Sequence, residues 1–199
     1  MDNLDKPWHM IQSNEDLGLI EFELQLWRVF WAFYQWLEEC QKASSSIQLS
    51  GLEVAILHTI RQNNKPKTLN DLGRLLNRPD SHNIRYGIKK LLNTQLIKKV
   101  KANSDSNKNI AFGISEKGIK VTDNYTLTRR KALIPLVGQR PDLGLLDIAQ
   151  RFIGLKALYE EAERSAATYI KPQEFEDPER TDQNSAENET ADLETETHF

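Results

Sequence analysis

The sequence predicts a mainly helical (α+β) fold that carries one small β-hairpin. Over most of residues 19–170 the apolar residues recur every three or four positions, which is typical of amphipathic helices. Two short β-like runs, residues 96–101 and 109–114, flank a turn-rich segment and indicate a pair of strands. The expected order is four helices, two strands and two further helices.

Residues 1–18 contain Pro7 and Gly18 and are expected to form a flexible leader. A long helix over residues 19–42 follows, because this stretch has neither proline nor glycine. Its apolar residues form two helical rows: Leu24, Trp27, Trp31 and Tyr34, and Leu26, Phe30, Phe33 and Leu37. A helix that is apolar around most of its circumference is usually buried on two sides. Either a second copy of the chain or the chain's own C-terminal helices cover the second side.

Capping residues mark the starts of the next helices. Ser50, with Glu53 three residues later, matches a capping box and begins the helix GLEVAILHTIRQ. Thr68 begins the shorter helix TLNDLGRLLN, and Pro79 or Asp80 opens a third helix. The expected core-facing residues of the first two helices are Leu52, Ile56, Leu57 and Ile60, and Leu69, Leu72, Leu75 and Leu76.

The third of these helices, residues 80–95, has two unlike faces. Ile84, Ile88 and Leu91 form one apolar stripe at helical spacing. At about 100° per residue, another face carries cations, amides and one phenol. These residues are His82, Asn83, Arg85, Tyr86, Lys89 and Lys90. Because a basic hairpin follows directly, the pattern indicates a reading helix with a wing, that is, a DNA-binding module.

Two helices are expected after the hairpin. Ser115 is a candidate N-cap for a helix that begins at Glu116 and continues towards Lys131. Asp142 is expected to cap a last long helix that runs to Ile170. The apolar surface of that helix consists of Leu146, Phe152, Ile153, Leu155, Tyr159 and Ala162.

Charge is strongly segregated along the chain, although the net charge is only -3. Between Arg61 and Lys131 there are 17 Lys and Arg against five acidic residues, a net charge of +12. Residues 171–199 hold two basic and ten acidic residues, a net charge of -8. This acidic tail has almost no aliphatic residues and is expected to be disordered. A solubilising role is favoured over the alternative that it folds back onto the basic region and competes with DNA.

Several classes of protein are disfavoured by the composition. No apolar run approaches the roughly 20 residues of a membrane span, and the N-terminus lacks the pattern of a secretory signal, which favours a cytoplasmic protein. The four histidines are scattered, without an HExxH motif or a phosphate-binding glycine loop, so neither an enzyme nor a cofactor is expected. A single cysteine, Cys40, excludes a disulfide framework; a buried structural thiol is favoured over a redox sensor.

Residues 50–121 resemble the winged helix-turn-helix of the MarR (multiple antibiotic resistance) family of transcription regulators. The resemblance lies in LSGLEVAILHTI, TLNDLGRLLNRP, IRYGIKKLLNTQLIKKV and the helix start SEKG. It implies a winged helix-turn-helix over residues 49–121, flanked by dimerisation helices within residues 19–48 and 122–170. Two residues depart from the family pattern. Gln95 stands where the family usually has glycine, and Lys108 occupies the basic position of the wing, where the family has arginine.

The resemblance implies a homodimer that binds double-stranded DNA sequence-specifically and regulates transcription. Helix 80–95 is expected in the major groove, and wing 96–114 at the adjacent backbone or minor groove. The expected DNA-binding residues are Lys67, Thr68, Ser81, His82, Asn83, Arg85, Tyr86, Lys89, Lys90, Lys101 and Lys108. A small aromatic effector is a further expected partner, with Trp27, Phe30, Trp31 and Tyr34 as its candidate pocket. The alternative is a winged-helix protein-protein interaction module without specific DNA binding.

Overall fold

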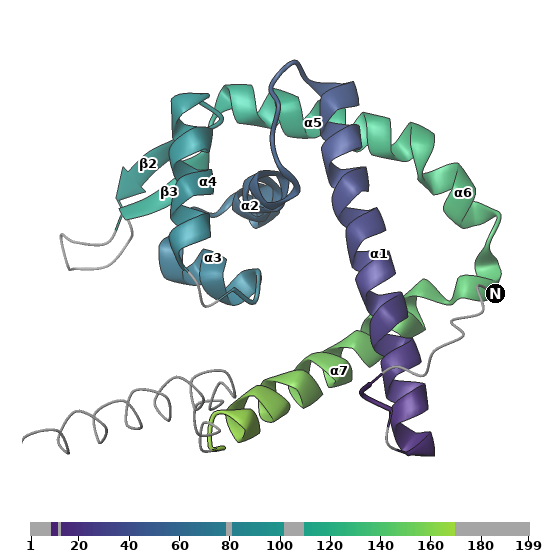
Figure 1. The fold of residues 1–199 in the computed structure, drawn as a ribbon. Coiled ribbons are helices and arrows are strands. Elements are labelled where there is room, and N and C mark those ends of the chain that lie inside the picture. Colours follow the sequence, from purple (N-terminus) through teal and green to yellow (C-terminus); the bar gives the residue numbers. More distant parts are fainter. Residues whose placement is uncertain (1–8, 12, 79–80, 102–109, 170–199) are drawn as a thin grey trace, which may run out of the picture. The chain divides into compact units, whose positions relative to one another are not determined.

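The computed structural model describes residues 9–11, 13–78, 81–101 and 110–169 (Figure 1). The chain divides into two compact units, residues 1–141 and 142–199. The elements are α1 (Asn14–Ser44), α2 (Gly51–Arg61), η1 (Gln62–Asn64), β1 (Lys67–Thr68), α3 (Leu69–Leu75), α4 (Ser81–Asn93), β2 (Ile97–Lys101), β3 (Ile110–Ile114), α5 (Glu116–Ala132), α6 (Ile134–Gly138), η2 (Pro141–Leu143) and α7 (Leu145–Ala166). The prediction of a mainly helical fold with a small β-sheet is confirmed.

Helix α1 begins earlier than the sequence pattern predicted. Ser13 is its N-cap: the Ser13 hydroxyl accepts a hydrogen bond from the Asp16 amide at 3.3 Å, and the Asp16 carboxylate accepts one from the Ser13 amide at 2.7 Å. This capping box starts the helix within the region expected to be a flexible leader, so that prediction is wrong for residues 14–18.

The core of the first unit lies between α2, α3 and α4. Its fully buried side chains include Val54, Ile56, Leu57, Ile60, Leu72, Ile84 and Leu91. The apolar stripe predicted for α4 is therefore confirmed, and so are the capping boxes of Ser50 with Glu53 and of Thr68 with Asp71. Leu75 is 44% exposed and does not face the core as expected, because α3 ends there.

Three antiparallel strands form the sheet in the order β1-β3-β2. Strand β2 pairs with β3 from Ile97 opposite Ile114 to Lys101 opposite Ile110, as the hairpin pattern predicted. The two-residue strand β1 was not predicted, because two residues are too few to show an alternating pattern. It pairs with β3 on the side opposite β2 and so ties the start of α3 to the wing.

The turn between α4 and the wing is left-handed even without a glycine. Gln95 has φ of 60°, and its amide donates to the Leu92 carbonyl at 2.9 Å. The Leu96 amide donates to the Leu91 carbonyl at 2.9 Å, which completes a Schellman motif. The buried Leu96 side chain anchors the turn, so the core packing holds Gln95 in the geometry that glycine adopts more readily.

Helix α5 packs against both the wing and α1. Ser115 caps it as predicted, since its hydroxyl accepts a hydrogen bond from the Gly118 amide at 2.9 Å. Gly118 lies against the backbone at the start of the wing, where an added Cβ would lie 2.1 Å from the Leu96 carbonyl oxygen. Further along α5, the Cys40 thiol of α1 lies 3.8 Å from the Tyr125 carbonyl oxygen. Figure 1 shows α5 passing the C-terminal part of α1.

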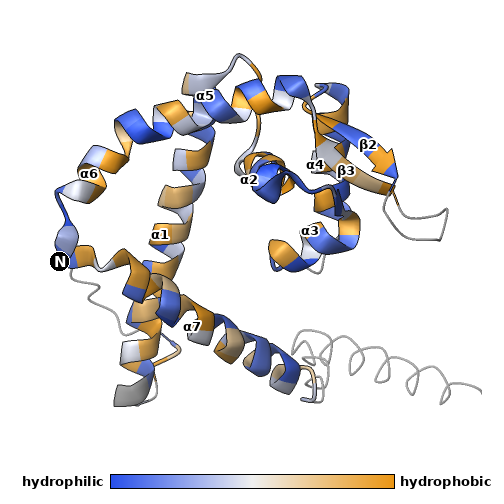
Figure 2. Cartoon of the chain, turned by 180° about the vertical axis from the view of Figure 1, so that it is seen from behind, coloured by the Kyte–Doolittle hydropathy of each residue, from blue (hydrophilic) through white to orange (hydrophobic). Residues whose placement is uncertain are grey.

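In the second unit, α7 has Gly144 as its N-cap, in a left-handed conformation with φ of 52°. The expectation that Asp142 caps this helix is therefore wrong; Asp142 lies in η2, one residue before the end of that short turn. None of the residues of α7 is buried, and Figure 2 shows both hydrophobic and hydrophilic residues along this helix. Phe152 and Ile153 are among its exposed apolar residues. No helix within the described part of the chain is both long and apolar enough to cross a membrane.

Candidate nucleic-acid interface

Close packing between α2 and α4 fixes which face of α4 is exposed. An added Cβ at Gly87 would lie 2.6 Å from the terminal methyl group of Ile56, so this glycine allows the two helices to approach closely. Ile84, Ile88 and Leu91 turn inward beside it. The opposite side of the helix carries His82, Asn83, Arg85, Tyr86 and Lys89, all exposed.

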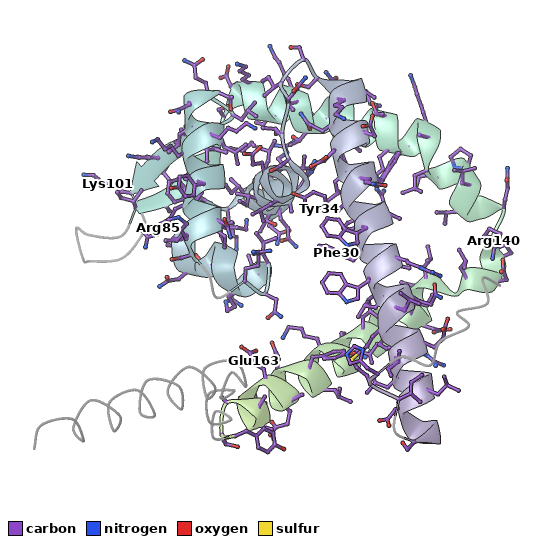
Figure 3. The ribbon with its side chains drawn as sticks, viewed as in Figure 1. Phe30, Tyr34, Arg85, Lys101, Arg140 and Glu163 are labelled. Atoms are coloured by element: carbon purple, nitrogen blue, oxygen red, sulfur yellow. The ribbon has the colours of Figure 1, made fainter. Side chains whose placement is uncertain are left out.

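Several of these exposed side chains interact along the helix. The rings of His82 and Tyr86 meet edge to face, with centroids 4.7 Å apart and an interplanar angle of 83°. Tyr86 remains 61% exposed. Arg85, labelled in Figure 3, donates a long hydrogen bond of 3.5 Å from Nε to the Ser81 hydroxyl, and its side chain is exposed. The face therefore presents donors and one aromatic edge, as direct readout of bases requires.

Lys67, one of the expected DNA-binding residues, is engaged within the fold. Its side chain is buried, and the ammonium group donates to the carbonyl oxygens of Ile60, Gln62 and Lys65 at 3.4, 2.6 and 3.0 Å. Burial lowers the pKa of Lys67 from its ordinary value. An ammonium group has three N–H donors, and here three backbone carbonyls between Ile60 and Lys65 accept from it, so Lys67 stabilises the fold.

Lys90 and Thr68 are also engaged within the fold. The Lys90 ammonium lies 2.7 Å from the Glu53 carboxylate and ties α4 to the first turn of α2. The Thr68 hydroxyl donates to the Asp71 carboxylate at 2.8 Å and accepts from the Asp71 amide at 3.2 Å. Hydrogen bonds from the Thr68 amide and hydroxyl lower the pKa of Asp71. An anionic carboxylate thus occupies the amino end of α3, beside the expected DNA-binding residue Thr68.

The wing adds cations that the sequence prediction left out. Lys98 and Lys99 are exposed on β2, together with the predicted Lys101 at the end of that strand. The Lys98-Lys99 pair stands in the predicted strand and was therefore available as a signal in the sequence. Lys108 lies outside the described residues.

A groove of about 530 Å³ separates the exposed face of α4 from the sheet. Three cations stand around it, and aliphatic and aromatic side chains contribute to its wall. Its lining residues are Arg85, Ile88, Lys89, Leu92, Asn93, Lys99, Ile110 and Phe112. Helix α4 and strand β2 thus both contribute cationic side chains to this groove.

A second, larger groove of about 740 Å³ lies between α1, α2 and α5. Most of its wall is apolar, and its polar residues include His58 and Arg129. Its lining residues are Val29, Ala32, Phe33, Trp36, Leu37, Val54, Ala55, His58, Thr59, Tyr125, Thr126, Arg129 and Leu133. None of the four aromatic residues expected to form an effector pocket lines this groove.

His58 is the most unusual polar group of the second groove. Its Nε2 atom is buried and forms no hydrogen bond with any described residue. The ring lies on Tyr125, with centroids 4.4 Å apart. Burial, with a smaller contribution from the positive charge of Arg129, lowers the pKa of His58 below 6.5. A neutral imidazole and a guanidinium therefore face the same apolar groove.

The four predicted aromatic residues of α1 form a cluster of ring contacts. Phe30 contacts Trp27, Trp31 and Tyr34, with ring centroids 6.3, 5.4 and 6.0 Å away. Figure 3 shows Phe30 and Tyr34 projecting from the same side of α1. Trp27, Phe30 and Trp31 are about half exposed, whereas the Tyr34 ring lies against Gly51.

The described residues give little support to redox sensing at Cys40 or to metal binding. Cys40 is buried, and that burial raises the pKa of its thiol, which favours the structural role over redox sensing. No cluster of three or more His, Cys, Asp or Glu that could hold a metal ion occurs among residues 9–11, 13–78, 81–101 and 110–169.

Comparison with known proteins supports the same architecture. Residues 49–118 match the family model of a winged helix DNA-binding domain. No curated protein sequence matches the chain. The solved structure of reduced AbfR bound to DNA is similar, with 18% sequence identity and a TM-score of 0.59 over 73% of this chain and 98% of that one.

Two further solved structures share the fold. Staphylococcus aureus MarR in complex with salicylate and kanamycin has 18% identity and a TM-score of 0.56, over 73% of this chain and 95% of that one. CouR from Rhodococcus jostii RHA1 bound to p-coumaroyl-CoA has 12% identity and a TM-score of 0.55, over 67% and 90% of the two chains. The protein is therefore a winged helix protein. More particularly, its fold is similar to that of Staphylococcus aureus MarR, and residues 49–118 match the model of a winged helix DNA-binding domain.

Proposed function

We propose that this protein is a homodimeric transcription regulator that binds double-stranded DNA sequence-specifically. The exposed face of α4 carries the proposal, because it has cations, an amide and a phenol but no carboxylate among its described residues. This face enters the major groove, while Lys98, Lys99 and Lys101 of the wing contact the adjacent backbone or minor groove. The proposed base-reading residues are Ser81, His82, Asn83, Arg85, Tyr86 and Lys89.

Selection of bound genomic fragments, followed by titration on the selected site, tests this function. Arg85→Ala should lower the affinity for the selected site by about 1 to 3 kcal/mol and relax the base preference at one position. Lys101→Ala should weaken binding to all duplexes alike and reduce the salt slope by about one. Lys42→Ala, which removes an equal charge from the exposed end of α1, is the matched control and should change neither quantity. Absence of binding to any duplex at low salt would favour the protein-protein interaction module instead.

The exposed apolar surface of α1 and α7 supports the homodimer. Large apolar residues are exposed on both helices: Leu19, Trp27, Val29, Phe30, Trp31 and Phe33 on α1, and Leu145, Leu146, Phe152, Ile153 and Leu158 on α7. Soluble monomers rarely expose large apolar patches, whereas homodimer interfaces are rich in apolar residues. A second copy therefore covers these faces. Sedimentation equilibrium should give twice the chain mass of 23.0 kDa, and a stable monomer at micromolar concentration would contradict the homodimer.

The groove between α1, α2 and α5 supports an effector site for a small aromatic acid. Its apolar wall suits an aromatic ring, and Arg129 supplies a guanidinium for a carboxylate. His58 Nε2 provides a further polar position when the imidazole carries its proton there. Calorimetric titration with salicylate and with uncharged salicylamide separates ring binding from charge recognition. Salicylate should bind more tightly, and Arg129→Gln should remove that preference.

A further inference from the structure

The groove between α4 and the sheet has a feature that phosphate binding leaves unexplained. Ile110 of β3 is 53% exposed, and it lines the groove with Phe112, Ile88 and Leu92. Phosphate and sugar contacts are polar and gain nothing from an aliphatic and aromatic wall. This part of the surface therefore fits a partner that brings an apolar side chain of its own.

The cationic side chains that line the same groove favour a partner of negative charge. Arg85, Lys89 and Lys99 stand around it from α4 and β2. Within the described part of the chain, no carboxylate pairs with any of the three. A groove lined both by apolar side chains and by three cations is complementary to a peptide in which acidic residues flank an aromatic residue.

The chain itself contains such a peptide in its acidic tail. Residues 174–177 read Glu-Phe-Glu-Asp, so three carboxylates adjoin Phe175. Phe175 is one of only two Phe, Tyr or Trp residues in residues 171–199, the other being Phe199. The tail as a whole carries a net charge of -8 against +12 for residues 61–131, which favours its association with the basic surface.

We propose that the segment at residues 174–177 docks in the groove between α4 and the sheet. Phe175 packs against the apolar wall, and the neighbouring carboxylates pair with Arg85, Lys89 and Lys99. The regulatory consequence rests on the proposed DNA-binding function: DNA needs the same cations, so the tail and DNA exclude each other and the tail lowers the affinity for DNA.

Zero-length carbodiimide cross-linking of the full chain without DNA tests docking directly. This reagent joins a carboxylate to an amine in contact with it, and mass spectrometry locates the linked residues. We expect links from residues 174–177 to Lys89 and Lys99, and their loss in Phe175→Ala. Leu193→Ala, which removes an apolar tail residue outside the acidic-aromatic segment, is the matched control and keeps the links. Links spread evenly over the exposed lysines, or unchanged in Phe175→Ala, would overturn docking.

Titration of a random duplex at low salt tests the competition. Phe175→Ala and the triple variant Glu174→Gln, Glu176→Gln, Asp177→Asn should each bind DNA several-fold more tightly than the unaltered chain. Leu193→Ala should bind like the unaltered chain. Equal affinities for all four proteins, with localised cross-links, would refute the competition while leaving docking in place. If no protein binds any duplex and the cross-links remain localised, the DNA-binding function fails and the docking site stands.

Discussion

Replacement of Gly118 by alanine sets two physical effects against each other. In a helix, alanine is favoured over glycine by at most about 1 kcal/mol, which predicts a more stable protein. At this position, however, the new Cβ would lie 2.1 Å from the Leu96 carbonyl oxygen and 2.6 Å from the terminal methyl group of Ile114. The close neighbour is backbone, which cannot rotate away as the end of a side chain can.

Relief of this clash would move α5 away from the turn between α4 and the wing. That movement would weaken the two hydrogen bonds that Ser115 donates to the Leu96 carbonyl, at 3.0 Å from its amide and 2.9 Å from its hydroxyl. Each such bond contributes about 0.5 to 1.5 kcal/mol, and overpacking itself costs about 1 to 3 kcal/mol. After the gain in helix propensity is subtracted, Gly118→Ala should destabilise the protein by about 2 to 4 kcal/mol.

Urea unfolding followed by circular dichroism measures this difference. The matched control is Gly18→Ala in α1, where no atom lies within 4 Å of the added Cβ. This control should gain stability by about 0.5 to 1 kcal/mol from helix propensity alone. If Gly118→Ala unfolds at the same urea concentration as Gly18→Ala, the close packing of α5 on the wing is refuted.

Three further predictions concern the turn, the second groove and the buried lysine. Gln95→Gly should raise the unfolding free energy by about 0.5 to 1 kcal/mol, because glycine adopts φ of 60° without strain; an unchanged urea midpoint would contradict a strained turn. The folded state holds His58 neutral with a pKa below 6.5, so the unfolding free energy of the protein carries no penalty from His58 above pH 6.5 and declines as the pH falls towards the lowered pKa. His58→Gln should reduce that decline in urea titrations between pH 7 and 5. An identical pH profile for the two proteins would rule out this linkage. Lys67→Met should cost about 1 to 3 kcal/mol of stability, because it leaves buried carbonyls without donors. The same variant should keep the salt slope of DNA binding. A salt slope reduced by one would show instead that Lys67 contacts a DNA phosphate.

Much of the local structure was predictable because its signals are short in range. The capping box of Ser50, the apolar stripe of α4 and the hairpin all depend on residues within a few positions of one another. The same rule applied to Ser13 and Asp16 would have placed the true start of α1, so this error was avoidable. The start of α7 was not predictable in this way, because its N-cap Gly144 has no side chain to signal a cap.

The sequence by itself determined the order of the elements and the face of α4 that points away from the core. Helical periodicity is a local property, and it fixes that direction once Ile84, Ile88 and Leu91 are buried. Only the tertiary structure decided which cations stay available. Lys67 donates to carbonyl oxygens and Lys90 pairs with Glu53. Lys89, in contrast, pairs with no carboxylate in the described part of the chain. The reason is physical: a cation is engaged or left available according to which acceptors the packed elements bring within about 3 Å of it.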